Sequence, residues 1–141
     1  MFSTSLTSFT RSFKRLPTVI PRNLTDAKFL TIDKKNCTLS WKNYSQIDIT
    51  LQDRATTVVF PIRLRRDAGK IITCVREGGI TSLADKQNPG IELRVGFDRG
   101  ILYFAARNEE GSISTGLAPS EASLAIALIQ QAERKRVYRS S

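Results

Sequence analysis

The 141-residue sequence contains no histidine. This absence excludes Ser-His-Asp and Cys-His nucleophiles, an imidazole general base and every metal site that uses histidine. The two cysteines, Cys37 and Cys74, cannot form a zinc site alone, and a single disulfide would be a poor framework for a chain of this length. Enzymes and metalloproteins are therefore disfavoured, and we expect no metal, no cofactor and no small-molecule substrate.

Long apolar runs and stretches rich in glycine and proline are also missing. The longest apolar run, Leu124–Ile129, is far too short to span a bilayer, so we expect no transmembrane segment. The chain has eight glycines and five prolines, 40% hydrophobic residues and 25% charged residues. This is the composition of one ordinary globular domain.

Acidic residues are few relative to basic ones. Twenty-two Lys and Arg stand against 13 Asp and Glu, which gives a formal net charge of +9. Such a surplus favours a polyanionic partner, first nucleic acid and second an anionic membrane surface. Residues 1–25 hold four bases and no acid, residues 133–141 hold four bases and one acid, and residues 54–76 hold six bases and one acid. The basic ends can also be read as solvated tails.

Residues 1–22 form a basic segment with helical periodicity. At about 100° per residue one apolar stripe collects Phe2, Leu6, Phe9, Phe13 and Leu16, and the basic residues lie opposite it. Pro17 would end this helix. A serine-rich, acid-free segment of this kind resembles a mitochondrial transit peptide, which predicts a mitochondrial location. The alternative is a basic arm that threads along RNA, as in virus coat subunits and ribosomal proteins, with the virion as the location.

Residues 23–132 read as a single globular β-rich domain that ends in a helix, followed by a basic C-terminal tail, 133–141. Short apolar and alternating segments predict strands in the first half, with no helix and no internal repeat evident. These segments are Phe29–Asp33, Cys37–Trp41, Ile47–Gln52, Thr57–Arg66 and Ile71–Val75. Because Pro61 cannot donate to a strand ladder, we expect its strand at a sheet edge or with a bulge.

The second half contains the clearest hairpin. Ile91–Phe97 and Ile101–Ala106 flank the turn Asp98-Arg99-Gly100, and Gly100 is suited to a positive φ. The second of these strands is apolar on both faces, which predicts a central position in the sheet. A further turn at Glu109–Gly111 leads into a short strand through Ile113.

A helix closes the chain. Pro119 suits its first position, and the expected buried stripe contains Leu124, Ala125, Leu128, Ile129 and Ala132. The predicted fold class is therefore α+β, with an antiparallel sheet of about seven or eight strands and one C-terminal amphipathic helix packed on it. We expect this helix to mediate a homo- or hetero-oligomer.

No catalytic constellation is present. Glu109 and Glu110 are adjacent in a turn, where their side chains point apart instead of converging on a substrate. The glycines do not have the spacing of a phosphate-binding loop that opens a helix.

Basic and aromatic residues on strands instead suit single-stranded nucleic acid. Candidate base-stacking residues are Trp41, Tyr44 and Tyr103. Candidate phosphate contacts are Arg63, Arg65, Arg66, Lys70, Arg76, Arg94 and Arg99. Alternation places Arg63 and Arg65 on the same face of the predicted strand Thr57–Arg66. The competing interpretations are core packing for the aromatic residues and surface solubility for the basic ones.

Residues 91–136 also resemble a known structural unit. Strands from Gly-Ile-Glu-Leu-Arg-Val-Gly-Phe through Ile-Leu-Tyr-Phe, a glycine turn, and Gly-Leu-Ala-Pro-Ser-Glu before an amphipathic helix give the order strand–strand–strand–helix. This order is similar to the unit of small single-stranded-DNA-binding transcriptional coactivators, Whirly proteins and the mitochondrial guide-RNA-binding proteins of kinetoplastids. The Lys-Gly-Lys turn typical of that unit is Asp98-Arg99-Gly100 here.

The resemblance implies curved sheets that bind single strands and helices that assemble an oligomer. The sequence thus predicts a non-catalytic, oligomeric protein that binds single-stranded nucleic acid, RNA in preference to DNA. The alternative is a structural assembly subunit, such as an RNA-packaging viral coat protein or an organellar ribosomal protein.

Overall fold

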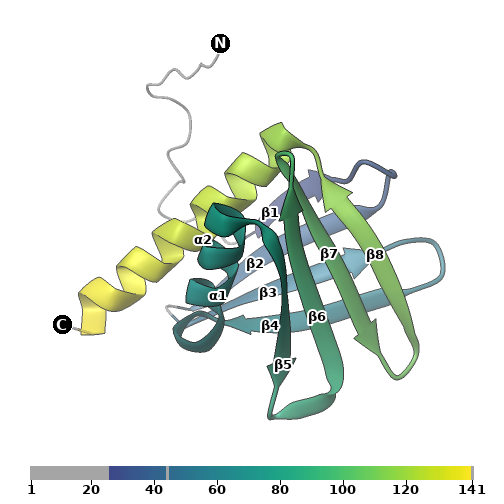
Figure 1. Cartoon of the computed structure of the whole chain (residues 1–141). Coiled ribbons are helices and arrows are strands. Elements are labelled where there is room, and N and C mark those ends of the chain that lie inside the picture. Colours follow the sequence, from purple (N-terminus) through teal and green to yellow (C-terminus); the bar gives the residue numbers. More distant parts are fainter. Residues whose placement is uncertain (1–25, 44, 141) are drawn as a thin grey trace.

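Four strands followed by one helix occur twice along the chain (Figure 1). The computed structural model describes residues 26–43 and 45–140, so the predictions for residues 1–22 and for Tyr44 fall outside the described residues. The first half contains β1 (Asp26–Leu30), β2 (Asn36–Asn43), β3 (Gln46–Gln52), β4 (Thr57–Arg63) and α1 (Leu64–Glu77). The second half contains β5 (Gly79–Asp85), β6 (Asn88–Asp98), β7 (Ile101–Asn108), β8 (Gly111–Leu117) and α2 (Pro119–Ser140).

The eight strands form two antiparallel sheets rather than one. Each sheet contains four strands in sequence order, β1-β2-β3-β4 and β5-β6-β7-β8. The strands of one sheet run across those of the other, with β4 in contact with β6, β7 and β8 (Figure 1). The predicted α+β class, the strand number and the C-terminal helix are thus confirmed, and β4 with its Pro61 is an edge strand as expected.

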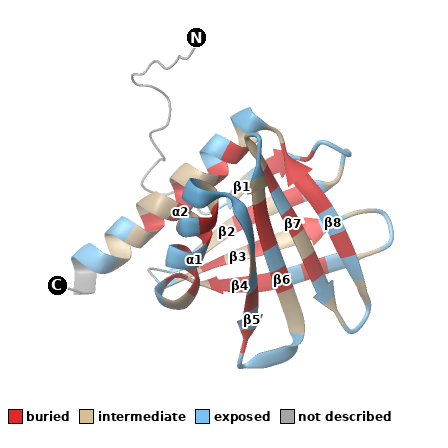
Figure 2. Ribbon diagram, viewed as in Figure 1, coloured by how far each residue is buried: buried red, intermediate tan, exposed pale blue. Residues whose placement is uncertain are grey.

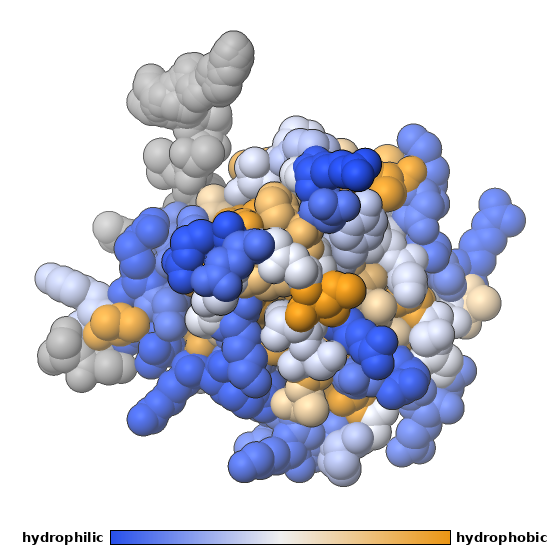
Figure 3. All heavy atoms as spheres, viewed as in Figure 1, coloured by the Kyte–Doolittle hydropathy of each residue, from blue (hydrophilic) through white to orange (hydrophobic). Residues whose placement is uncertain are grey.

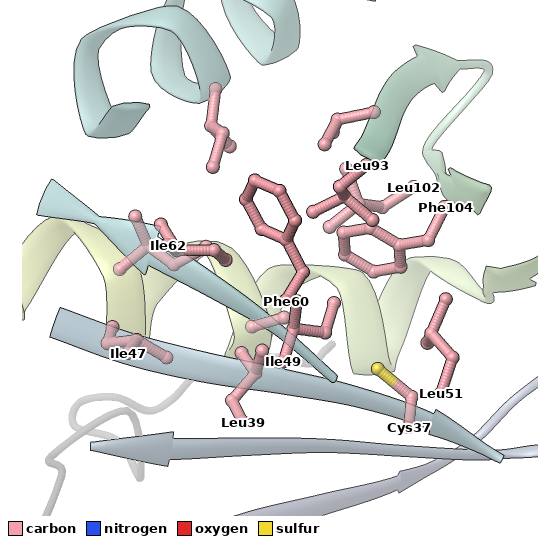
Figure 4. Packing of buried hydrophobic residues seen from close by; sticks show 14 of the residues in the cluster. Cys37, Leu39, Ile47, Ile49, Leu51, Phe60, Ile62, Leu93, Leu102 and Phe104 are labelled. Carbon is pink, nitrogen blue, oxygen red and sulfur yellow. The ribbon is translucent and has the colours of Figure 1, made fainter. Parts of the chain in front are cut away.

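Alternating side chains of both sheets build one core between them. In β3 the residues at every second position, Ile47, Ile49 and Leu51, are fully or almost fully buried. Phe60 of β4 and Phe104 of β7 are the largest fully buried side chains and lie between the two sheets (Figure 4). Figure 2 shows the same alternation as buried and exposed stripes along the strands. The strand periodicity therefore determines which face of each sheet turns inward.

The β6–β7 hairpin has the two-residue turn that its sequence indicates. Arg99 and Gly100 have φ values of 54° and 83°, which is the left-handed geometry of a type I′ turn. Asp98 is therefore paired with Ile101, and the register continues with Gly96 opposite Tyr103. β7 is an inner strand, as its apolar character on both faces predicts.

The first half contains a helix that the sequence analysis missed. The predicted strand Thr57–Arg66 is wrong beyond Arg63, and the predicted strand Ile71–Val75 lies within α1. Helical spacing buries Leu64, Ala68, Ile71 and Cys74 on one side of α1. Leu64 is buried in α1, and the alternation of β4 would bury it as well. The alternating pattern of the strand therefore continues without a break into the first residue of the helix.

The buried stripe of α2 differs from the predicted one at a single position. Ala125, Leu128, Ile129 and Ala132 are buried as expected, but Leu124 is 43% exposed. Ala122, three residues before Ala125, is buried instead. The helix continues to Ser140 through the segment predicted as a tail. Among the described residues, no helix is long and apolar enough to cross a membrane.

Candidate nucleic-acid interface

The outer face of the β5–β8 sheet, the side turned away from the core, carries an exposed tyrosine among small residues. The strand register places one residue from each strand in a line, which we call the Tyr103 row: Ile80, Gly96, Tyr103 and Gly116. Tyr103 is 40% exposed and Ile80 is 78% exposed. The adjoining line on the same face contains Ser82, Arg94, Ala105 and Ser114. An aromatic ring thus stands on an open sheet with glycine on both neighbouring strands.

An open pocket of about 860 Å³ lies over the Tyr103 row. It reaches from Ile80 at the start of β5 to Ile32 in the β1–β2 turn and so crosses all four strands. Its volume falls within the usual range of ligand sites. Figure 3 shows, for the face in view, that exposed apolar atoms form small patches among hydrophilic side chains.

Two exposed arginines share one carboxylate on this face. Nη2 of Arg107 donates to Oε1 of Glu92 at 2.6 Å, and Nε of Arg94 lies 3.7 Å from Oε2 of Glu92. The two arginine side chains are 67% and 60% exposed. Two guanidinium groups thus share the carboxylate of Glu92, and a second carboxylate, that of Glu109, lies against Gly90 at the end of this face. Because ion pairs this exposed contribute little stability, both guanidinium groups can turn to phosphate oxygens.

Asp33 fixes the β1–β2 turn against β8 and thereby forms one end of the pocket. Its carboxylate accepts hydrogen bonds from the hydroxyls of Thr31 and Thr115 and lies 3.2 Å from Nζ of Lys35. The backbone N–H of Ile32 donates to the carbonyl oxygen of Gly116 at 2.9 Å. Burial raises the pKa of Asp33, but the hydrogen bonds from Thr115, Thr31 and Lys35 outweigh it and lower the pKa to about 2.

Arg63 and Arg66, two of the predicted phosphate contacts, are partly exposed side chains in an ionic network with two buried carboxylates. Arg66 binds the carboxylate of Asp67 through Nε and Nη2, and its Nη1 donates to Asp85 at 3.0 Å. Arg63 lies 3.3 Å from Asp85 and donates to Gln46 at 2.7 Å. Asp67 has no exposed surface, and Asp67 also accepts the backbone N–H of Arg63 at the start of α1. These two arginines join β4, α1 and β5, and their ionic partners lie within the protein.

This network predicts a pH dependence of stability. Burial raises the pKa of Asp85, but hydrogen bonds from Arg63, Asn88 and Arg66 outweigh it and lower the pKa from 3.8 to about 2. A carboxyl whose pKa is lower in the folded state stabilises the fold above its unfolded pKa, and this contribution disappears as the pH falls through the folded pKa. We therefore expect the free energy of unfolding to decline as the pH falls from about 5 to about 2.

Urea unfolding at a series of pH values measures this decline. Asp85→Asn is expected to make it shallower, with Asp33 supplying the remaining slope. Asp98→Asn is the control because its side chain is 71% exposed, and this variant should keep the full slope. Equal slopes in all three proteins would contradict the role given to Asp85.

The remaining predicted residues lie at separate places. Arg65, Lys70 and Arg76 are exposed on α1, so Arg63 and Arg65 do not share a strand face as predicted. Arg99 is at the tip of the β6–β7 turn, with its side chain 90% exposed. Two of the predicted nucleic-acid-binding residues, Arg94 and Tyr103, lie together on the outer face of the β5–β8 sheet.

Trp41 is positioned for packing more than for stacking on a base. It is half-buried against the core, and Nζ of Lys135 lies 5.4 Å from the centroid of its ring. At this distance the ammonium group makes a cation–π interaction that links α2 to β2. One face of the indole ring is therefore already occupied by the protein.

The sequence analysis missed most of the residues around Tyr103. Gly96, Gly116 and Ile80 lie in its row, and Arg107 lies four residues further along β7 on the same face; none was a candidate. A signal was available for two of them. A two-residue turn at Arg99-Gly100 fixes the hairpin register, which places Gly96 opposite Tyr103 and Arg107 opposite Glu92.

Comparisons with known proteins add no functional assignment. No protein-family model matches the chain, and no curated protein and no solved structure was found to be similar.

Within residues 26–43 and 45–140, no group of three or more acidic or cysteine side chains is placed to hold a metal ion. Cys37 and Cys74 are buried free thiols, and burial raises the pKa of Cys37 to about 12.

Proposed function

We propose that this protein binds single-stranded nucleic acid on the outer face of its β5–β8 sheet, without catalysing a reaction. The observation that carries the proposal is the exposed Tyr103 ring, which has glycine on both neighbouring strands and the basic Arg94 and Arg107 nearby on the same face. An aromatic platform beside cationic side chains is the usual means of holding unpaired bases and their phosphates. Within this proposal RNA is the preferred partner, because unpaired bases are common in the loops and bulges of RNA.

The order of elements supports the resemblance to Whirly and guide-RNA-binding proteins as part of this proposal. A fold made of two such units needs a helix in the first half of the chain as well as at its end. The sequence analysis found no such helix, whereas α1 occupies this position in the structure. Both halves of the chain thus have the order of four strands and a helix.

We also propose that α2 mediates an oligomer. Leu124 and Val137 of α2 are 43% and 50% exposed, although both are large and apolar. The C-terminal part of the helix extends beyond the two sheets in Figure 1. Because these two residues lie about 140° apart around the helix axis, a second helix can cover one of them, and we assign the contact to Leu124.

Salt-dependent binding tests the proposed interface. The full chain should bind fluorescein-labelled 20-residue oligouridylate and oligothymidylate, with log affinity falling linearly against log salt because each neutralised phosphate releases counterions. Each phosphate contact contributes about 0.7 to the slope for single strands. Replacing both Arg94 and Arg107 by Ala should therefore make the slope shallower by about 1.4.

The matched control replaces two exposed basic residues of α1, Arg65 and Arg76, by Ala. This variant removes the same charge from a different surface and should keep the wild-type slope within about 0.3, since its residues make no phosphate contact. The opposite pattern would move the interface to α1. A full chain that binds neither oligonucleotide at low salt would overturn the proposed function and favour a structural assembly subunit.

A further inference from the structure

Gly96 lies in the interior of β6 at a position where the backbone does not require glycine. Among the described glycines, the positive φ values belong to Gly78, Gly79 and Gly100, so Gly96 has a conformation open to any residue. Glycine in a strand interior destabilises the strand, because it loses more entropy and has no side chain to pack. A strand glycine without a conformational reason commonly marks a place where something approaches the backbone closely.

The protein packs more tightly beside Gly116 than beside Gly96. A Cβ atom at Gly116 would lie 3.2 Å from Cδ1 of Tyr103 and 3.3 Å from Cδ1 of Ile32. The packing of these two side chains explains why residue 116 is glycine. A Cβ atom at Gly96 would meet nothing closer than Cγ1 of Ile80 at 3.4 Å, which is an ordinary contact. The carbonyl oxygen of Gly79 at 3.5 Å and Cβ of Tyr103 at 3.8 Å are ordinary contacts as well, so no steric clash requires glycine at residue 96.

The open position forms a slot with two apolar walls. Ile80 of β5 and Tyr103 of β7 flank Gly96 on the neighbouring strands, and the Tyr103 ring leans toward Gly116 on its other side. Two strand spacings, about 9.5 Å, separate the backbones of Ile80 and Tyr103. Their side chains come closer, since a Cβ atom at Gly96 would lie 3.4 Å from Cγ1 of Ile80 and 3.8 Å from Cβ of Tyr103. A flat ring in contact with both walls needs about 7–8 Å, because each carbon contact is about 3.5–4.0 Å. The slot over Gly96 thus has the width of one planar ring.

The positive charge of the protein near the slot favours planar groups that also carry a negative charge. Arg94 precedes Gly96 by two residues on the same face, and it is one of the residues that line the pocket. The protein as a whole carries a net charge of +9. A planar ring attached to a phosphate matches both features, and a nucleotide unit of a single strand has this chemistry.

We propose that the slot over Gly96 holds one unpaired nucleobase between Ile80 and Tyr103, while Arg94 contacts the adjoining phosphate. This inference rests on the proposed function. It adds a subsite that contacts the base itself, in addition to the contacts with the sugar-phosphate backbone. Because the walls of the slot are apolar and aromatic, the subsite accepts every base and carries no sequence preference of its own. Gly96 is the residue that keeps the subsite open.

Gly96→Val is the decisive variant because it fills the slot while favouring the strand. Valine is a strong strand former, and its Cβ has room at this position. The thermal midpoint should be equal to that of the wild type or higher. Affinity of the full chain for a 20-residue oligothymidylate should fall about 5- to 150-fold, which is the measured range for losing one stacked base.

A 20-residue abasic deoxyribose-phosphate strand separates the base from the phosphates. Wild-type protein should bind the abasic strand more weakly than oligothymidylate, and Gly96→Val should bind both with similar affinity. The control is Ala84→Val, which places a valine side chain on the outer face of β5, away from Gly96, and should bind as the wild type.

The outcomes separate the two proposals. If wild-type protein binds oligothymidylate and Gly96→Val binds it equally well, the subsite is wrong while the proposed function stands. The subsite is also wrong if oligothymidylate and the abasic strand bind equally to the wild type. If wild-type protein binds neither strand nor oligouridylate, the proposed function fails and the subsite fails with it.

Discussion

Replacing Arg66 by Met is expected to lower the free energy of unfolding by about 3–5 kcal/mol, the usual result of removing one partner of a buried ion pair. The carboxylate of Asp67 has no exposed surface and is bound by two guanidinium nitrogens of Arg66. Without Arg66, this charge keeps the backbone N–H of Arg63 as a hydrogen-bond donor and loses its closest positive charge. Methionine preserves much of the apolar length of the side chain, so the measured loss reports the charge.

Arg65→Met is the matched control for this experiment. The two arginines are consecutive residues in the first turn of α1, but Arg65 is exposed. Its replacement should change the free energy of unfolding by no more than about 0.5 kcal/mol, as is usual for surface positions. Urea unfolding at pH 7 measures both values. Similar values for the two variants would mean that the network of Arg66, Asp67 and Asp85 does not hold α1 in place.

The same network determines how binding experiments must be designed. Substitution of Arg63 or Arg66 would disturb the junction of β4, α1 and β5, so a loss of nucleic-acid binding in such a variant could arise from a loss of fold. Exposed arginines such as Arg94 report on binding without this complication. The structure thus shows which arginines can be replaced to test nucleic-acid binding without disturbing the fold. The sequence alone does not distinguish them.

Strand alternation and turn residues were sufficient to predict most of the fold. The β6–β7 hairpin follows from apolar residues at every second position and from Gly100 in its turn, and both are local signals. The division into two sheets has no local signal, because it depends on which strands pair across the whole chain. The helix α1 was missed because alternation from Val58 to Leu64 continues by coincidence into its first residue.

The candidate site was only partly predictable for a related reason. Tyr103 and Arg94 attract notice because stacking and phosphate binding need their side chains. Gly96 and Gly116 are important for the space they leave, and that space is recognised only when the neighbouring strands are in register. The ionic network of Arg63 and Arg66 could not be predicted, because α1, which contains Asp67, and β5, which ends at Asp85, were not placed from the sequence.

A pair of identical substitutions in α2 distinguishes the core from the proposed oligomer contact. Leu128 is 2% exposed and Leu124 is 43% exposed, and the two residues are one helical turn apart. Leu128→Ala should lower the free energy of unfolding by about 2–5 kcal/mol, because it leaves a cavity among buried residues. Leu124→Ala should lower it by about 0.5 kcal/mol or less in the monomer, while weakening assembly if Leu124 contacts a second helix. Both substitutions give alanine in the same helix, so differences in helix propensity cancel.

Urea unfolding and light scattering after size exclusion measure the two effects separately. We expect Leu128→Ala to reduce the urea midpoint at every protein concentration. We expect Leu124→Ala to shift the oligomer toward smaller species at low concentration, because a weaker contact dissociates first on dilution. Equal losses of stability would show that α2 packs with a different face inward. An oligomer that is unchanged in Leu124→Ala would place the assembly contact away from this part of α2, and a wild-type chain that stays monomeric would remove the proposed oligomer.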